Sequence, residues 1–246
     1  MTTRPSRWKG QTRMGLGWGE FVGVTGDNAP HSHHAVQVLL SVQPQPLWTA
    51  ACGWQDVCGA VIGPELPHQL GSNGQPAHLL YVEPHSDAGQ RLMAGLNSGL
   101  RLLTQTECQA ARRAVERSDT PVEAVTGVLS PAAPQCGPKD DREIEAWIAA
   151  LPPTLPEGLT AAACARQLGL SSSRFLHRFR AHTGLPLRPY LRWRRLLVAL
   201  RTVMQGASLT EAAHAAGFAD SSHFTRTFRR HFGLAPSAIA SSASLT

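Results

Sequence analysis

The feature that most constrains this 246-residue chain is a repeat inside its C-terminal half. Shifted by 49 positions, the segment that contains Phe175 and Phe179 aligns with the one that contains Phe224 and Phe228. Each copy combines a short alanine-rich helix, a glycine turn, a polar capping residue and a second helix with the pattern F-x-x-x-F. Alanines allow close helix packing, and glycine tolerates the positive φ at which helices commonly end. The repeat therefore predicts two helix-turn-helix units.

Capping residues and outward positions of the two second helices carry the functional prediction. Ser171 and Asp220 are favourable N-caps, and the N-terminal positions of such a helix can enter a DNA major groove. A guanidinium pairs with both acceptors of a guanine edge, which makes Arg226 the favoured base reader. Arg180 and Arg229, with Arg178 and Arg230, are expected at phosphates. The candidate DNA-binding residues are Ser172, Ser173, Leu176, His177 and Arg180 in the first copy and Ser221, Ser222, Thr225, Arg226 and Arg229 in the second.

A long helix over residues 187–206 is predicted between the two copies. At ~1.5 Å per residue it would span ~27–30 Å, close to the ~34 Å of one DNA turn. We expect it to hold the two second helices at successive grooves along one side of a duplex. Its predicted core stripe consists of Tyr190, Trp193, Leu197, Leu200 and Met204.

Charge is distributed unevenly along the chain. Residues 1–138 carry 9 Lys+Arg against 10 Asp+Glu, whereas residues 139–246 carry 14 against 7, so the net charges are −1 and +7. A basic face attracts polyanions such as nucleic acid. The sign changes at a proline-rich stretch, so we predict a sensor domain over 10–128, a linker over 129–138 and a DNA-binding domain over 139–246. A basic amphipathic helix alone is more often only a solvated face, so the prediction rests on the charge together with the repeat.

The composition also limits the compartment. The five cysteines are odd in number and form no C-x-x-C pair, which favours reduced thiols over a disulfide framework. No apolar run approaches the ~18 residues of a membrane span. We therefore expect a cytoplasmic protein without membrane association.

The second copy, SLTEAAHAAGFADSSHFTRTFRRHFGLAP, resembles the signature of the AraC/XylS family of regulators, and LRWRRLLVAL resembles its connecting helix. The resemblance covers residues 159–236 closely. It implies an all-α domain of about seven helices that binds double-stranded promoter DNA, with activation favoured over repression. It further implies RNA polymerase and a second copy of the chain as partners. One departure is visible, because Ser237, Ala238 and Ile239 follow the final Gly-x-x-Pro where the family usually has Tyr-Arg.

The N-terminal half predicts a β-rich sensor. Apolar runs at 35–42, 60–63 and 78–83 alternate with turn residues, which is typical of strands. Residues 87–129, including QRLMAGLNSGLRLL, have helical spacing. His31 and His33 with Gln37, and later His68, loosely resemble the metal motif of the cupin barrel, with glutamine where that motif has glutamate. The predicted class is α+β, a cupin-like β-barrel with dimerisation helices followed by the all-α domain.

The chemistry of the four polar residues His31, His33, Gln37 and His68 stays open. They could line an effector pocket without metal, bind a metal as part of a signal, or form a metalloenzyme site. A neutral amide is a poor ligand for a dication, so we predict a small effector of unknown identity, no cofactor and no enzymatic activity. The alternatives are a cupin-type metalloenzyme with a DNA-binding appendage and a dimeric architectural factor that senses nothing.

Overall fold

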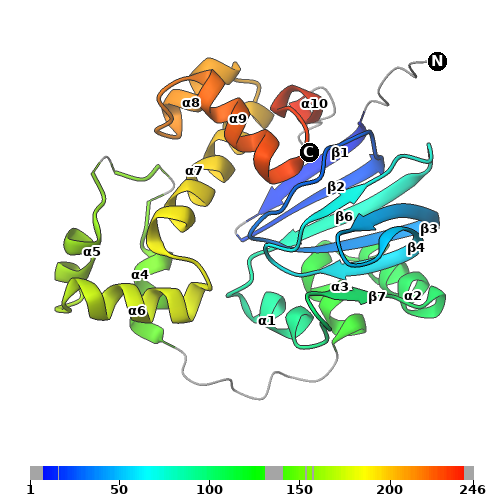
Figure 1. The fold of residues 1–246 in the computed structure, drawn as a ribbon, viewed down its shortest axis with the longest axis horizontal. Helices are drawn as coiled ribbons and strands as arrows, with labels where there is room; N and C mark the ends of the chain where they lie inside the picture. The colour runs from blue at the N-terminus through cyan, green and yellow to red at the C-terminus, as the bar shows by residue number, and fades with distance from the viewer. Residues whose placement is uncertain (1–7, 16, 131–140, 153, 157, 241–246) are drawn as a thin grey trace. The chain divides into compact units, whose positions relative to one another are not determined.

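The computed structural model describes residues 8–15, 17–130, 141–152, 154–156 and 158–240. The described residues fall into two compact units (Figure 1), one drawn from 1–134 together with 226–246 and the other from 135–225. Most of the predicted linker, 129–138, lies outside the described residues. The domain boundaries predicted from charge therefore stay predictions.

The first unit contains one antiparallel sheet. Its strands follow the order β1-β2-β6-β3-β4-β7, and β5 pairs with β3. This agrees with the predicted β-rich N-terminal half, whereas closure into a cupin-like barrel stays a prediction. The strands are β1 (Lys9–Gly15), β2 (Trp18–Val24), β3 (Val36–Thr49), β4 (Gly53–Ile62), β5 (His68–Leu70), β6 (Pro76–Val82) and β7 (Leu100–Leu102).

Strand β3 lies in the middle of this sheet and is buried on both faces. Val38 and Leu40 belong to a cluster that includes side chains of three helices, α1 (Asp87–Met93), α2 (Gln105–Glu116) and α3 (Pro121–Leu129). Leu39 points to the opposite face and joins a second cluster with Ile62 and Leu79. Because successive side chains of a strand alternate between faces, the continuous apolar run of β3 is what a doubly covered strand requires.

One predicted helical segment is wrong. The sequence at 90–103 has helical spacing, but α1 ends at Met93 and Leu100–Leu102 form β7, which pairs with β4. Between them Ser98 and Gly99 have φ of 50° and 82°, which a right-handed helix excludes. The apolar residues of this segment are therefore divided between the end of α1 and the strand β7.

The helices of the C-terminal half include those that the repeat and the long segment between its two copies predict. The elements are α4 (Arg142–Ala149), α5 (Ala161–Gln167), α6 (Ser172–Thr183), α7 (Leu187–Met204), α8 (Leu209–Ala215), α9 (Ser221–Phe232) and α10 (Pro236–Ala240). The division between the two units falls within α9. Among the described residues, no helix combines the length and the apolar character that crossing a bilayer demands.

Aromatic side chains form the core of the second unit. Phe175 and Phe179 on α6 are fully buried, and their ring centroids lie 5.6 Å apart. The Trp147 ring on α4 packs edge-on against Phe175 at 5.3 Å, and Tyr190 of α7 packs against Phe179 at 5.2 Å. The F-x-x-x-F stripe thus joins three helices into one core.

We expect Phe175→Ala to destabilise this unit by about 3–5 kcal/mol, because it leaves a cavity between α4 and α6. The measurement is urea unfolding followed by circular dichroism. Leu176 is the adjacent residue on α6 and is 38% exposed, so Leu176→Ala is the matched control and should cost at most about 0.5 kcal/mol. Equal losses for both variants would contradict the assigned faces of α6.

Candidate functional site

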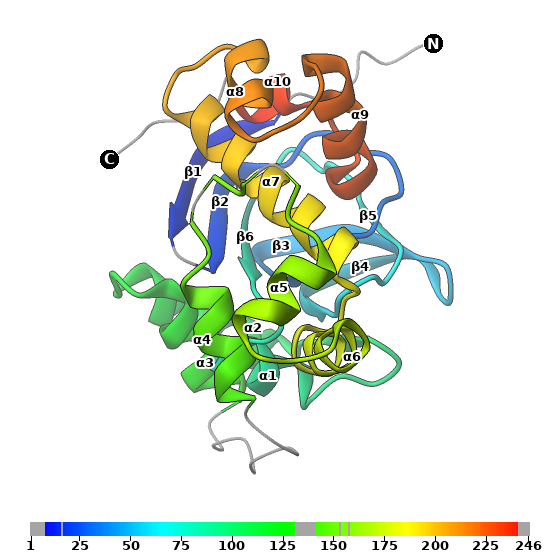
Figure 2. The same ribbon diagram turned by 90° about the vertical axis from the view of Figure 1, so that its left-hand side faces the viewer.

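The turn between α5 and α6, two helices labelled in Figure 2, has the geometry that the repeat predicts. Gly169 has φ of 63°, its N–H donates to Arg166 O, and Leu170 N–H donates to Ala165 O at 2.9 Å. These two bonds satisfy carbonyl groups at the C-terminal end of α5, and together they form a Schellman motif. The Ser171 hydroxyl then accepts a hydrogen bond from Arg174 N–H, which confirms the predicted N-cap of α6.

The turn between α8 and α9 repeats this pattern. Gly217 has φ of 75°, and Phe218 N–H donates to Ala213 O at 2.9 Å. Asp220 Oδ1 accepts from His223 N–H at 2.6 Å, which confirms the second predicted cap. A carboxylate at a helix N-terminus also interacts favourably with the helix dipole. Both copies therefore use a glycine C-cap and a polar N-cap to set the start of the second helix.

The candidate DNA-binding residues lie away from the buried aromatic stripe of each helix. Phe175 and Phe179 on α6, like Phe224 and Phe228 on α9, are fully buried. Eight of the ten candidates are exposed, and Ser221 and Thr225 are half-buried. The exposed candidates are Ser172, Ser173, Leu176, His177, Arg180, Ser222, Arg226 and Arg229. These side chains are accessible to a ligand, and their contact with DNA stays a prediction.

Arg178 has a different place from the one predicted. We predicted it as a phosphate contact, but Nε donates to Asp141 Oδ2 at 2.6 Å and Nη2 to Glu143 Oε2 at 2.6 Å. The Arg178 guanidinium lowers the pKa of the Asp141 carboxyl through this hydrogen bond. Two carboxylates thus neutralise Arg178, so it ties α6 to the start of α4.

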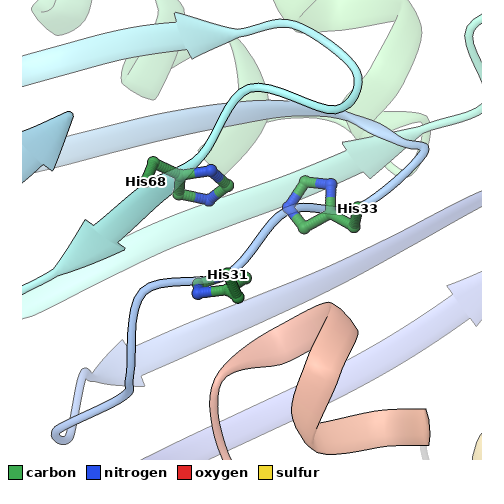
Figure 3. Close-up of side chains that lie close together, drawn as sticks. All are labelled: His31, His33 and His68. Atoms are coloured by element: carbon green, nitrogen blue, oxygen red, sulfur yellow. The ribbon is translucent and has the colours of Figure 1, made fainter. Parts of the chain in front are cut away.

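In the first unit the structure brings His31, His33, Gln37 and His68 together, as the sequence pattern predicts. His31 and His33 precede β3, Gln37 lies on β3, and His68 opens β5. His31 and His68 exchange backbone hydrogen bonds of 3.0 and 2.9 Å. One nitrogen from each of the three rings lies within 4.8 Å of the others, and Figure 3 shows the rings gathered around one point.

Backbone carbonyls fix the tautomer of each ring. Nδ1 lies 2.9 Å from Ala29 O in His31, 3.0 Å from Ala35 O in His33 and 2.9 Å from Leu66 O in His68. A carbonyl only accepts, so each Nδ1 carries the proton. Each neutral imidazole therefore presents the lone pair of Nε2.

Gln37 connects two of these rings. The position assigned to its Oε1 lies 2.8 Å from His33 Nε2 and 3.1 Å from His68 Nε2. Two acceptors cannot share a hydrogen bond, and the oxygen and nitrogen of a carboxamide are assigned from their network. The network here favours the amide nitrogen facing both rings, because its two N–H groups can then donate to both lone pairs. In this orientation the Nε2 lone pairs of His33 and His68 each have a donor, and the group of side chains carries no net charge.

Burial keeps these rings uncharged. Desolvation lowers the pKa of His31 to about 4, lowers the pKa of His33, and places the pKa of His68 well below the usual value. Neutral imidazoles whose Nδ1–H is held by carbonyls are also the form in which histidine binds zinc-like metals. The cluster can accordingly hold a metal through three Nε2 atoms or accept hydrogen bonds from a polar molecule.

Sequence reasoning missed Tyr81 on β6. Its ring packs edge-on against His33 at 5.3 Å, and the β3–β6 register places it opposite Gln37. Burial raises the pKa of the Tyr81 hydroxyl. No local pattern marks this residue, because its position depends on a strand pairing between distant segments.

Comparison with known families and proteins supports the prediction of a helix-turn-helix domain in the helical half. A helix-turn-helix domain family matches residues 164–242. An HTH-type transcriptional activator RhaS from Pectobacterium carotovorum is 46% identical over 68 residues, which are 27% of this chain and 24% of that protein. The RhaS protein of Escherichia fergusonii is 39% identical over 101 residues, which are 40% of this chain and 36% of that protein. The matched part thus spans less than two fifths of either relative.

Solved structures resemble the chain more widely but at low identity. ToxT from Vibrio cholerae O395 has a TM-score of 0.60 at 12% identity and covers 93% of this chain and 98% of that one. ToxT from Vibrio cholerae strain SCE256, bound to an unsaturated fatty acid, has a TM-score of 0.55 at 10% identity and covers 97% and 94%. At this identity the likeness shows a shared fold.

The buried histidines predict an acid-sensitive first unit. The pKa of His31 is about 4 in the folded chain against an ordinary 6.5, so the unfolded state binds more protons between these values. Stability is therefore lost as pH falls through that window, by up to about 1.4 kcal/mol per pH unit for each such group.

The measurement is urea unfolding at about pH 7 and about pH 5, where His31→Asn should reduce the pH dependence by the share of this one ring. The exposed His177 on α6 provides the control variant His177→Asn, which should keep the wild-type slope. Stability of the first unit that is equal at both pH values would show that the rings are not held neutral.

Proposed function

We propose that this chain, whose helix-turn-helix half places it in the AraC/XylS family of transcription regulators, binds promoter DNA sequence-specifically and responds to an effector through its N-terminal half. The observation that carries the DNA-binding part is the duplicated turn, in which a Schellman C-cap and a polar N-cap start both α6 and α9. In each case the exposed polar side chains lie on the face opposite a buried phenylalanine pair.

Activation rather than repression is the regulatory outcome that we propose. The matched relatives are described as transcriptional activators, and the net charge of +7 over residues 139–246 suits a phosphate backbone. RNA polymerase and a second copy of the chain are the proposed partners. The proposed recognition residues are the ten exposed or half-buried positions of α6 and α9 described above.

For sensing, we propose that an effector contacts the cluster of His31, His33, Gln37 and His68. A ToxT structure of similar fold carries an unsaturated fatty acid, which supports ligand binding as a use of this fold. The cluster here is polar and neutral, so we propose a small molecule with hydrogen-bond donors that replace the Gln37 amide. An effector acts only by favouring one conformational state over another.

Arg226 should read a base, since it is exposed in the first half of α9. We expect Arg226→Ala to weaken specific binding by about 1–3 kcal/mol and to relax the preference at one base pair. Selection of binding sites from random DNA, followed by titration at several salt concentrations, measures both effects.

Two control variants separate charge from recognition. Arg226→Lys keeps the charge but loses the planar fork, so it should relax specificity while keeping most of the salt dependence. Arg113 is exposed near the end of α2, and Arg113→Ala should leave binding unchanged. An unaltered base preference in Arg226→Ala would remove the assigned role, and wild-type binding that does not weaken with salt would contradict the DNA-binding proposal.

The sensing proposal predicts that His68→Asn reduces the response of DNA occupancy to growth conditions in cells. Occupancy of genomic sites by the wild-type protein should change between growth conditions, and occupancy by the variant should change less. Chromatin immunoprecipitation with sequencing under matched expression measures this, with Arg113→Ala, an exposed substitution on α2, as the control. Wild-type occupancy that is constant across all conditions would favour an architectural factor that senses nothing.

A further inference from the structure

A second cluster of titratable side chains lies in the first unit, and the predictions from sequence did not include it. Strands β3 and β6 pair with Val36 opposite Val82. The residues just before β3 and just after β6 therefore lie side by side. His34 comes from the first of these segments, and Glu83 and His85 come from the second.

The geometry of this cluster suits a single ion. One ligand atom from each of His34, Glu83 and His85 lies within 4.8 Å of the other two, and His85 Nδ1 is 3.6 Å from Glu83 Oε2. His34 and Glu83 are buried, whereas His85 is half-buried. The cluster thus has two interior groups and one that borders solvent, through which an ion can enter.

The backbone around Glu83 is held on both sides. Glu83 N–H donates to Gly17 O at 2.9 Å, and Glu83 O accepts from Ser86 N–H at 3.1 Å and from Ser86 Oγ at 2.7 Å. A Cβ at Gly89 would lie 2.1 Å from Glu83 O, so α1 packs directly on this turn. Such preorganisation lowers the entropy that ion binding must offset.

We propose that His34, Glu83 and His85 bind a divalent transition-metal ion of the zinc class. Two imidazoles and one carboxylate are a donor set that such ions accept, and three protein ligands leave room for water or an outside ligand. Glu83 supplies a negative charge, which the cluster around Gln37 does not have.

The site is connected to the end of the N-terminal half. Ser86, next to His85, caps α1 by accepting from Gly89 N–H at 3.1 Å. Arg91 of α1 donates to Ser130 O, and Ser130 Oγ donates to Arg91 O at 2.9 Å. Ser130 is the last residue described before 141. An ion that holds His85 therefore also holds the start of α1, and its use as a regulatory signal rests on the proposed function.

Co²⁺ titration of the full-length, metal-free protein tests the site. Co²⁺ bound by nitrogen and oxygen ligands gives visible ligand-field absorption, and Zn²⁺ should abolish this absorption by displacement. We expect stoichiometric binding by the wild-type protein and at least ~10-fold weaker binding by Glu83→Gln and by His85→Gln. The matched control is His78→Gln, because His78 lies 3.0 Å from Glu20 in a histidine–carboxylate pair that, within the described residues, belongs to no group of three possible ligands.

Three results would overturn the proposal. They are the absence of stoichiometric Co²⁺ binding, unchanged binding in both Glu83→Gln and His85→Gln, and loss of all binding in His68→Asn while His85→Gln retains it. Circular dichroism of each variant establishes that it is folded. Because His85 is half-buried, its substitution should disturb the fold least among the three ligand residues. DNA binding of the wild-type protein with and without chelator is measured separately, so a protein that binds Co²⁺ but no DNA would contradict only the proposed function.

Discussion

Pairing of β3 with its neighbours is the constraint on which the first unit depends. This 14-residue strand is hydrogen-bonded to β4, β5 and β6, and its apolar residues contribute to cores on both faces. Gln37 lies on this strand, and both histidine clusters form where chain segments enter or flank it. A shift of one residue in its register would turn Gln37 to the other face and separate the clusters.

In the helical half the corresponding constraint is the turn geometry rather than the charge. The Gly169 and Gly217 turns end one helix, and the Ser171 and Asp220 caps start the next. The phenylalanine pairs then decide which face of the second helix is buried. Arg226 is exposed on α9, whereas the partly exposed Arg178 of α6 is engaged by Asp141 and Glu143.

Local signals made the helical half predictable. Glycine turns, caps and F-x-x-x-F spacing act within a few residues, and the structure has the helices and caps that they predict. The sequence pattern also predicted that His31, His33, Gln37 and His68 lie together, but it could not predict the tautomers of the rings. The segment 90–103 failed because helical spacing alone cannot show that Ser98 and Gly99 adopt positive φ. Tyr81, and the cluster of His34 with Glu83 and His85, were missed because they depend on β3–β6 register.

The two histidine clusters differ in charge, and this difference assigns them different ligands. Around Gln37 the Nδ1 protons are held by carbonyls and the amide can donate to two Nε2 lone pairs, so a cation there would displace the amide without any compensating negative charge. Beside His34 and His85 the Glu83 carboxyl group can supply that charge to a bound ion. We therefore propose a polar molecule as the ligand of the first cluster and a dication as the ligand of the second.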